Sequence, residues 1–200
     1  MIDEGYIKYH ITWKETDVAP IASDDEIIAA RNQMFDLNLI GYDSKNQVGY
    51  GNISKRLAAN NFAISGTQTG HIPRIKPEHF TRVTDYNIAE NRLSCEGPIK
   101  ASSESLTHAA IYELDPAIKA VIHVHNKHIW ENYNELLPTT KKDIPYGTPQ
   151  MAREIFRLWR LADLPKQKIL IMAGHVDGVI SFDSNFEEAA ERLEFYLGKL

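Results

Sequence analysis

IKAVIHVH, residues 118–125, has the composition of a buried β-strand, yet it carries two histidines, His123 and His125, two positions apart. In a strand, residues i and i+2 point to the same face, so the two imidazoles converge while Ile122 and Val124 face the opposite side. Paired imidazoles on one rigid strand suit a divalent metal ion. Two polar residues on an exposed strand face would give the same spacing, so the pair alone leaves both interpretations open.

The segments on either side of this strand alternate between helix and strand. SSESLTHAAIYEL (102–114) is predicted to be a helix that stops before Pro116. GTPQMAREIFRLWRLAD (147–163) is predicted to be a second helix, with Thr148 as its N-cap and a proline in its first turn. QKILIMAGHVDGVISF (167–182) has the pattern of two apolar strands around a glycine-rich turn. This alternation is typical of a three-layered α/β protein.

Farther from this strand along the sequence, two more helices and a group of strands are expected. One helix is predicted to start at Ser23, its N-cap, and to end just before Gly41. Residues 47–83 have the pattern of short strands broken by glycine turns. The last helix is predicted to start at Ser184, which fits a capping box with Glu187. Near the N-terminus, apolar and polar residues alternate from Ile7 to Lys14, which indicates a half-exposed strand.

Length and composition set the class of protein. The 200 residues, of which 43% are hydrophobic and 24% charged, predict one domain over 1–200 with a strand-like N-terminal extension at about 1–20. The net charge of −5 gives no reason to expect nucleic acid or an anionic membrane as partner. The single cysteine, Cys95, and the lack of a signal peptide or of an apolar run of roughly 18–20 residues favour a cytoplasmic protein.

A metal site built on the histidine pair requires a third ligand and often includes a carboxylate. His175 lies in MAGHVDG, where Gly174 lets the backbone turn tightly, and an ordinary turn histidine is the alternative. Asp177 in the same turn is a weaker candidate. Glu104 opens a helix, where it complements the helix dipole, and it could also ligate the metal or act as acid/base. His108, one turn later, would either support Glu104 or serve as a structural histidine.

Three short segments suit anion binding. GYGNIS (49–54) and SGTQTG (65–70) are glycine turns whose N–H groups can form an anion-binding nest. SSE (102–104) puts two serines at a helix start, where N–H groups and hydroxyls both point outward. A single turn of this kind is usually only a turn. Three of them in one chain with a histidine pair are more suggestive.

In this order, the segments resemble the class II aldolase/adducin family, from about residue 25 to the C-terminus. No single element is specific, and the resemblance rests on the ordered set. Its members are GNISKR (51–56), SGTQTG (65–70), SSESLTHAAIY (102–112), HVH (123–125), IPYGT (144–148) and GHVDG (174–178).

The resemblance implies a three-layer α/β/α fold with a central, mainly antiparallel sheet flanked by helices. It implies a Zn²⁺ site, with Mn²⁺ or Co²⁺ as alternatives, made of His123, His125 and His175 with Glu104 as fourth ligand and acid/base. The residues implied for phosphate binding are Gly51, Asn52, Ser65, Gly66, Ser102 and Ser103. In the family, the metal polarises a carbonyl and stabilises an enediolate. Members are commonly homotetramers that cleave a small sugar phosphate or a related hydroxy-carbonyl compound.

The chain departs from the family's aldolases beyond the H-x-H strand. Those enzymes carry a long stretch before the PYGT segment, including a tyrosine that protonates the product in a neighbouring subunit's site. Here residues 126–144 alone separate the two motifs, and Tyr133 is the candidate substitute. A sugar-phosphate epimerase or dehydratase on the same site is therefore an alternative. A non-catalytic, adducin-like structural module is another, although it would have no physical reason to keep three histidines and a carboxylate together.

Overall fold

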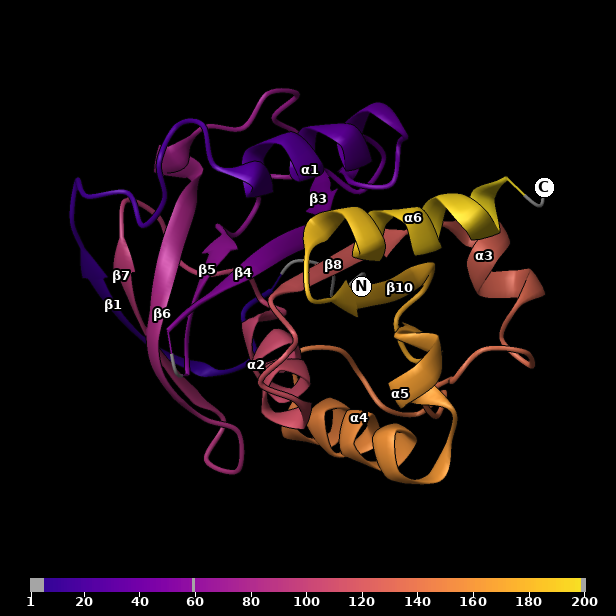
Figure 1. The fold of residues 1–200 in the computed structure, drawn as a ribbon. Helices are drawn as coiled ribbons and strands as arrows, with labels where there is room; N and C mark the ends of the chain where they lie inside the picture. The colour runs from indigo at the N-terminus through magenta and orange to yellow at the C-terminus, as the bar shows by residue number, and fades with distance from the viewer. Residues whose placement is uncertain (1–5, 59, 199–200) are drawn as a thin grey trace.

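The computed structural model describes residues 6–58 and 60–198. One eight-stranded sheet runs through it (Figure 1). Its strands, in spatial order, are β1 (His10–Glu15), β7 (Arg92–Gly97), β6 (Phe80–Asn87), β5 (Asn61–Ser65), β4 (Asn52–Ala58), β8 (Ala120–His125), β10 (Gly178–Asp183) and β9 (Ile169–Ile171). β1 and β7 pair in parallel, and the other neighbouring pairs of this described sheet are antiparallel. The mainly antiparallel sheet that the family resemblance implied is confirmed.

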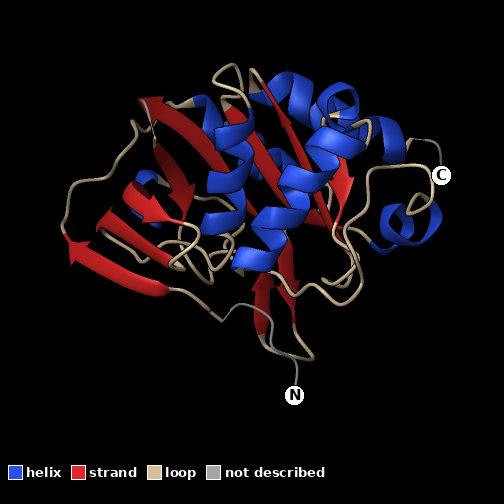
Figure 2. Cartoon of the chain, turned by 90° about the horizontal axis from the view of Figure 1, so that it is seen from below, coloured by secondary structure: helices blue, strands red, loops and turns tan. Residues whose placement is uncertain are grey.

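Helices cover both faces of the sheet, which gives the three expected layers (Figures 1 and 2). One face carries α1 (Glu26–Asp36), α3 (Lys127–Asn132) and α6 (Phe186–Leu197). The other face carries α2 (Ser105–Leu114), α4 (Pro149–Leu161) and α5 (Leu164–Gln167). The remaining elements are the hairpin β2 (Gly41–Asp43) and β3 (Val48–Tyr50) and the 3₁₀ turn η1 (Pro77–His79). No helix within the described ranges is long and apolar enough to cross a membrane.

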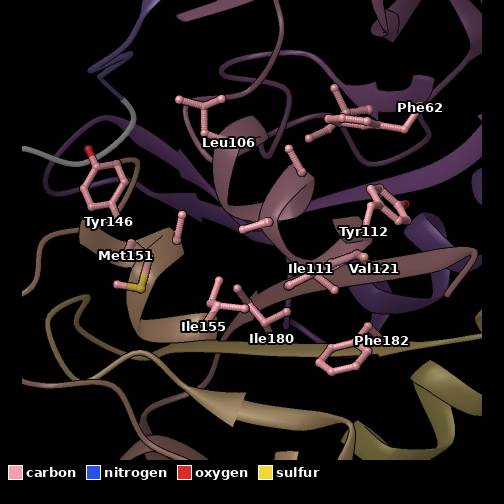
Figure 3. Close-up of a cluster of buried hydrophobic side chains, with 14 of the residues drawn as sticks. Phe62, Leu106, Ile111, Tyr112, Val121, Tyr146, Met151, Ile155, Ile180 and Phe182 are labelled. Atoms are coloured by element: carbon pink, nitrogen blue, oxygen red, sulfur yellow. The ribbon is translucent and has the colours of Figure 1, made fainter. Parts of the chain in front are cut away.

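Strand β8 lies inside the sheet and is buried on both faces. Ile122 and Val124 pack into the core beneath α1 and α6. Val121 packs into the core between the sheet and α2 and α4 (Figure 3). Because side chains alternate along a strand, His123 and His125 continue the row that Val121 begins. The histidine pair therefore lies on the α2 side of the sheet, at the end of a hydrophobic core.

Two of the predicted helix boundaries are confirmed. Thr148 is the N-cap of α4, and its side chain accepts a hydrogen bond from the backbone N–H of Met151. Helix α2 ends at Leu114, two residues before Pro116. Both signals are local, since a capping hydroxyl and a proline act within one turn of the backbone they affect.

The other predicted caps are displaced by one or more residues. Helix α1 is capped by Asp25 rather than Ser23, and it ends at a C-cap formed by Leu37, so that Gly41 already belongs to β2. Helix α6 is capped by Asn185, whose side chain accepts from the N–H of Glu188. The predicted capping box is therefore wrong by one residue. Asn, Asp and Ser cap helices about equally well, so neighbouring candidates are not separated by residue type alone.

Candidate metal centre and anion site

Three histidines converge at one end of β8. His123, His125 and His175 each offer a ring nitrogen, and these three atoms lie within 4.8 Å of one another. The ring centroids are 4.7 Å apart for His125 and His175 and 5.1 Å apart for the other two pairs. His175 comes from the turn between β9 and β10, and the antiparallel pairing of Gly178 with His125 brings that turn beside β8. Residues 50 positions apart in the sequence thus share one site.

Backbone geometry aims His175 into the site. The N–H of His175 donates to the carbonyl of Met172, and the N–H of Gly178 donates to the carbonyl of His175, which closes a tight turn. A Cβ at Gly174 would lie 1.9 Å from the carbonyl oxygen of Ile144, so only glycine lets the two segments approach this closely. The turn is therefore fixed on both sides, and the imidazole with it.

The electrostatics of the cluster favour neutral imidazoles. His123 and His175 are 1% and 3% exposed. Burial, together with the neighbouring His175, holds the pKa of both His123 and His125 well below the ordinary value. A neutral imidazole keeps a lone pair for a metal ion. The buried Nε2 of His123 has no hydrogen-bond partner among the described residues, and the Asn52 amide lies 3.1 Å from its Nδ1. The Asn52 atom that faces Nδ1 is the amide nitrogen Nδ2, so Asn52 donates and Nδ1 accepts.

Glu104 lies beside the three histidines. It is the N-cap residue of α2, only 1% exposed, and its Oε1 is 3.7 Å from Nδ1 of His175. Its side chain does not cap the helix, so the carboxylate is aimed at the cluster instead. Three imidazoles and a carboxylate form a ligand set that suits Zn²⁺, Mn²⁺ or Co²⁺, and the donor chemistry fits the metal that the sequence predicts.

His108 has the structural role that the sequence left open. Its Nδ1 lies 2.7 Å from the hydroxyl of Ser54, which is in turn 2.8 Å from the hydroxyl of Tyr112. Burial lowers the pKa of His108 to about 3. His108 is therefore a neutral hydrogen-bonding group that joins α2 to β4.

A small hollow of about 20 Å³ adjoins Glu104 and His123. Of the residues that the resemblance implied for phosphate binding, five line it: Gly51, Asn52, Gly66, Ser102 and Ser103. Ser65 is not among the lining residues, and its hydroxyl accepts a hydrogen bond from the N–H of Ile53. Sequence reasoning quoted but did not single out further lining residues, including Gly49 and Gln68. The Gln68 side-chain oxygen accepts from the N–H of Gly49 at 3.2 Å, as an anion oxygen would.

Arg31 holds the loop that forms one wall of this hollow. Its guanidinium donates to the carbonyl of Ile72, to that of Thr69 at 2.9 Å and to that of Gly70 at 3.1 Å. The side chain is 1% exposed, and burial lowers its pKa to about 10, so it stays charged at pH 7. Sequence analysis missed Arg31. The available signal was its place one turn after Ile27, on the apolar face of α1.

A larger, open hollow of about 690 Å³ lies on the other side of the histidines. It is lined by His125 and His175 together with Tyr50 and Tyr146 and by Lys8 from the N-terminal segment. Asp177, the weaker ligand candidate, also lines this hollow. Tyr133 does not, because its ring packs against Tyr196 of α6, with 4.9 Å between the ring centroids. Two tyrosines of this hollow pack on the histidines: Tyr146 is stacked on His175 at 4.4 Å, and the ring centroid of Tyr50 is 5.2 Å from that of His125.

Comparisons with known proteins bear on the family and the fold. A family model described as the class II aldolase and adducin N-terminal domain matches residues 26–197. Among solved structures, an L-fuculose 1-phosphate aldolase has a TM-score of 0.63 at 20% identity, covering 88% of this chain and 84% of that one. YgbL of Klebsiella pneumoniae, for which aldolase, epimerase and decarboxylase are the candidate activities, has a TM-score of 0.61 at 18% identity, covering 84% and 82%. L-fuculose 1-phosphate aldolase of Glaciozyma antarctica PI12 has a TM-score of 0.57 at 14% identity, covering 85% and 68%.

Proposed function

This chain belongs to the class II aldolase and adducin family, and we propose that it is a divalent-metal-dependent lyase. The reaction would cleave or form a carbon–carbon bond next to a carbonyl in a small sugar phosphate or related hydroxy-carbonyl compound. The observation that carries the proposal is the cluster of His123, His125 and His175, the first and last of them buried, with ring nitrogens within 4.8 Å of one another. Glu104, 3.7 Å from His175, adds the carboxylate that proton transfer needs.

The three histidines would hold the metal with Glu104 as fourth ligand, and Zn²⁺ is the first candidate, ahead of Mn²⁺ and Co²⁺. When bound, such an ion would polarise a carbonyl oxygen and stabilise the negative charge that develops on it. The neutral state of His123 and His125, which burial favours, supports this role.

Glu104 is the group that would move the proton. Its carboxylate is buried between the histidine cluster and the serine turn, so a proton taken from substrate at Glu104 is shielded from bulk water. The turn of Ser102 and Ser103 and the glycine loops would bind the phosphate through N–H groups and hydroxyls. Because the oxygen of Gln68 already accepts from Gly49, an arriving phosphate would displace that side chain and enlarge the hollow.

The same groups would also support an epimerase or a dehydratase, since each reaction needs a metal-polarised carbonyl and a proton carrier. The products separate these alternatives. A non-catalytic module of the adducin kind is disfavoured, because burying three imidazoles and a carboxylate costs free energy unless a ligand is bound. We also expect the homotetramer that is common in the family, which sedimentation equilibrium would measure.

Metal analysis of the purified protein is the first test. We expect close to one equivalent of zinc, manganese or cobalt per chain, lost together with activity on dialysis against a chelator and restored by the metal. The metal-loaded protein is then incubated with a panel of ketose and aldose phosphates, and products are identified by mass spectrometry and NMR. Release of two carbonyl fragments supports the lyase, whereas an isomer or a dehydrated product identifies one of the alternatives. A protein that binds no divalent metal would contradict the proposal.

A further inference from the structure

The N-terminal segment lies outside the family match, yet it reaches both halves of the proposed metal centre. We infer that Lys8 and Tyr9 are positioning residues of the active site. Tyr9 would hold the turn that carries Glu104, and Lys8 would hold the aromatic ring that packs on His175. The inference rests on the proposed function in that the metal is the group being positioned.

Tyr9 anchors the serine turn from a distance. Its side chain is buried, and its hydroxyl donates to the carbonyl of Ser102 at 2.8 Å, across 93 positions of sequence. That carbonyl also accepts from the hydroxyl of Ser105 at 2.6 Å, while the Ser102 hydroxyl accepts from the N–H of Glu104 at 3.3 Å. One hydrogen bond from the N-terminal segment therefore ends on the turn that orients the carboxylate of Glu104.

Lys8 acts on the opposite half of the site, through an aromatic ring. Its Nζ lies 3.6 Å from the ring centroid of Tyr146, a distance at which a cation and an aromatic face attract. The Tyr146 ring is stacked on the His175 imidazole, with 4.4 Å between centroids and 25° between planes. Tyr146 lies at the edge of the core on the α2 side (Figure 3). Lys8 therefore contacts the ring of Tyr146, and that ring packs directly on His175, a candidate metal ligand.

The backbone of this segment is fixed, which is what a positioning role requires. The Asn91 side chain donates to the carbonyl of Lys8 at 2.8 Å, and the N–H of His10 donates to the carbonyl of Asn91 at 2.8 Å. Next along the chain, β1 pairs with β7, and the indole N–H of Trp13 donates to the carbonyl of Gly97 at 3.1 Å. Residues 8–13 are therefore held against the sheet edge independently of Lys8's and Tyr9's side-chain contacts.

The test compares Tyr9→Phe and Lys8→Met with a matched control, Trp13→Phe. Tyr9→Phe removes the hydroxyl that contacts the carbonyls of Ala101 and Ser102, and Trp13→Phe removes the indole N–H that donates to the carbonyl of Gly97, but only the first change touches the site. Zn²⁺ affinity is measured by competition with a chelating dye, and the visible spectrum of the Co²⁺-loaded protein reports ligand geometry. We expect about 10-fold weaker Zn²⁺ binding and an altered Co²⁺ spectrum in Tyr9→Phe and Lys8→Met. Trp13→Phe should match the wild type, and Lys8→Arg, which keeps the cation, should restore most of the affinity.

The outcomes separate this inference from the proposed function. If the wild type binds metal and both variants bind it with wild-type affinity and spectrum, the N-terminal segment is structural only and the inference fails alone. Equal losses in Trp13→Phe would also overturn it, because a general loosening of the strand would then explain the effect. A wild type that binds no metal would overturn the proposed function, and the inference would fall with it.

Discussion

His123 follows a core valine, Val121, in one row of the strand and is itself buried, so its imidazole takes a place where an aliphatic side chain would pack, while His125, the next residue in the row, is half-buried. Burying a Val or Ile side chain contributes about 1.5–3 kcal/mol, whereas a buried imidazole nitrogen without a partner, such as Nε2 of His123, costs free energy. The stabilising contribution of an aliphatic side chain is therefore absent at this end of β8. A bound metal ion would recover it, since coordination satisfies the buried nitrogens.

Glu104→Gln separates the two roles proposed for this carboxylate. Glutamine keeps the shape and one ligating oxygen but cannot carry the proton, so we expect turnover to fall at least 100-fold while most of the metal stays bound. Turnover on the identified substrate and metal content are measured on the same preparation. His125→Ala is the matched contrast, because it should lose metal and activity together. Full activity in Glu104→Gln would rule out Glu104 as the acid/base.

At the residue scale, the sequence identifies the groups whose chemistry is local. The H-x-H spacing placed His123 and His125 on one face of a strand. The position of Glu104 at a helix start made it a candidate ligand or acid/base. The prediction that His175 converges on this pair rested on a family resemblance. The convergence itself depends on the pairing of β10 with β8, which the sequence pattern does not specify. Contacts such as that of Tyr9 with Ser102 could not be read from the sequence, since nothing in either segment specifies a partner 93 positions away.

The helix α1 contributes to the site through a single residue. Arg31 is buried on the face that Ile27 and Met34 share, and it bonds three carbonyls of the loop after Gly66. These hydrogen bonds fix the backbone of a loop whose residues Thr69 and Gly70 line the anion hollow. The amphipathic pattern predicted the helix correctly. It did not predict that a charge on its buried face organises a loop 38 to 41 positions later.

Arg31→Met should therefore destabilise the protein and loosen the loop. The methionine fills similar volume but leaves buried carbonyls without a donor, and we expect the free energy of unfolding to fall by about 2–4 kcal/mol. Arg74→Met is the control, because Arg74 forms an exposed ion pair with Asp36 whose loss should cost no more than about 0.5 kcal/mol. Urea denaturation measures both. Equal effects in the two variants would mean that the Arg31 hydrogen bonds do not hold the loop.

At the scale of the whole molecule, the layers were predictable and the strand order was not. Alternating helix and strand patterns predicted an α/β protein, because amphipathic elements must bury one face. The order β1-β7-β6-β5-β4-β8-β10-β9 is set by pairing between distant segments. In particular, β1 joins the edge in parallel with β7, 82 positions later, and this pairing carries Lys8 to the site. Hydrophobic periodicity specifies which face of a strand is buried, but it does not specify which other strand pairs with it.

Stability should depend on pH through histidines that the fold keeps neutral. Burial lowers the pKa of His108 from 6.5 to about 3, and it lowers those of His123 and His125 as well. Below pH 6.5 the unfolded chain binds protons that the folded chain does not, so the free energy of unfolding falls as the pH drops toward about 3. Above pH 6.5 both states are neutral, and the full contribution of these groups is present.

His108→Gln isolates one of these groups. Each fully buried histidine contributes a slope of about 1.4 kcal/mol per pH unit within this window, so the variant should lose stability less steeply than the wild type between pH 6 and 4. Urea denaturation of metal-free protein at several pH values gives the two slopes, because a bound metal would protect His123 and His125 from protons. The exposed His128→Gln is the control and should keep the wild-type slope. Parallel lines for His108→Gln and the wild type would show that the folded protein does not keep His108 uncharged.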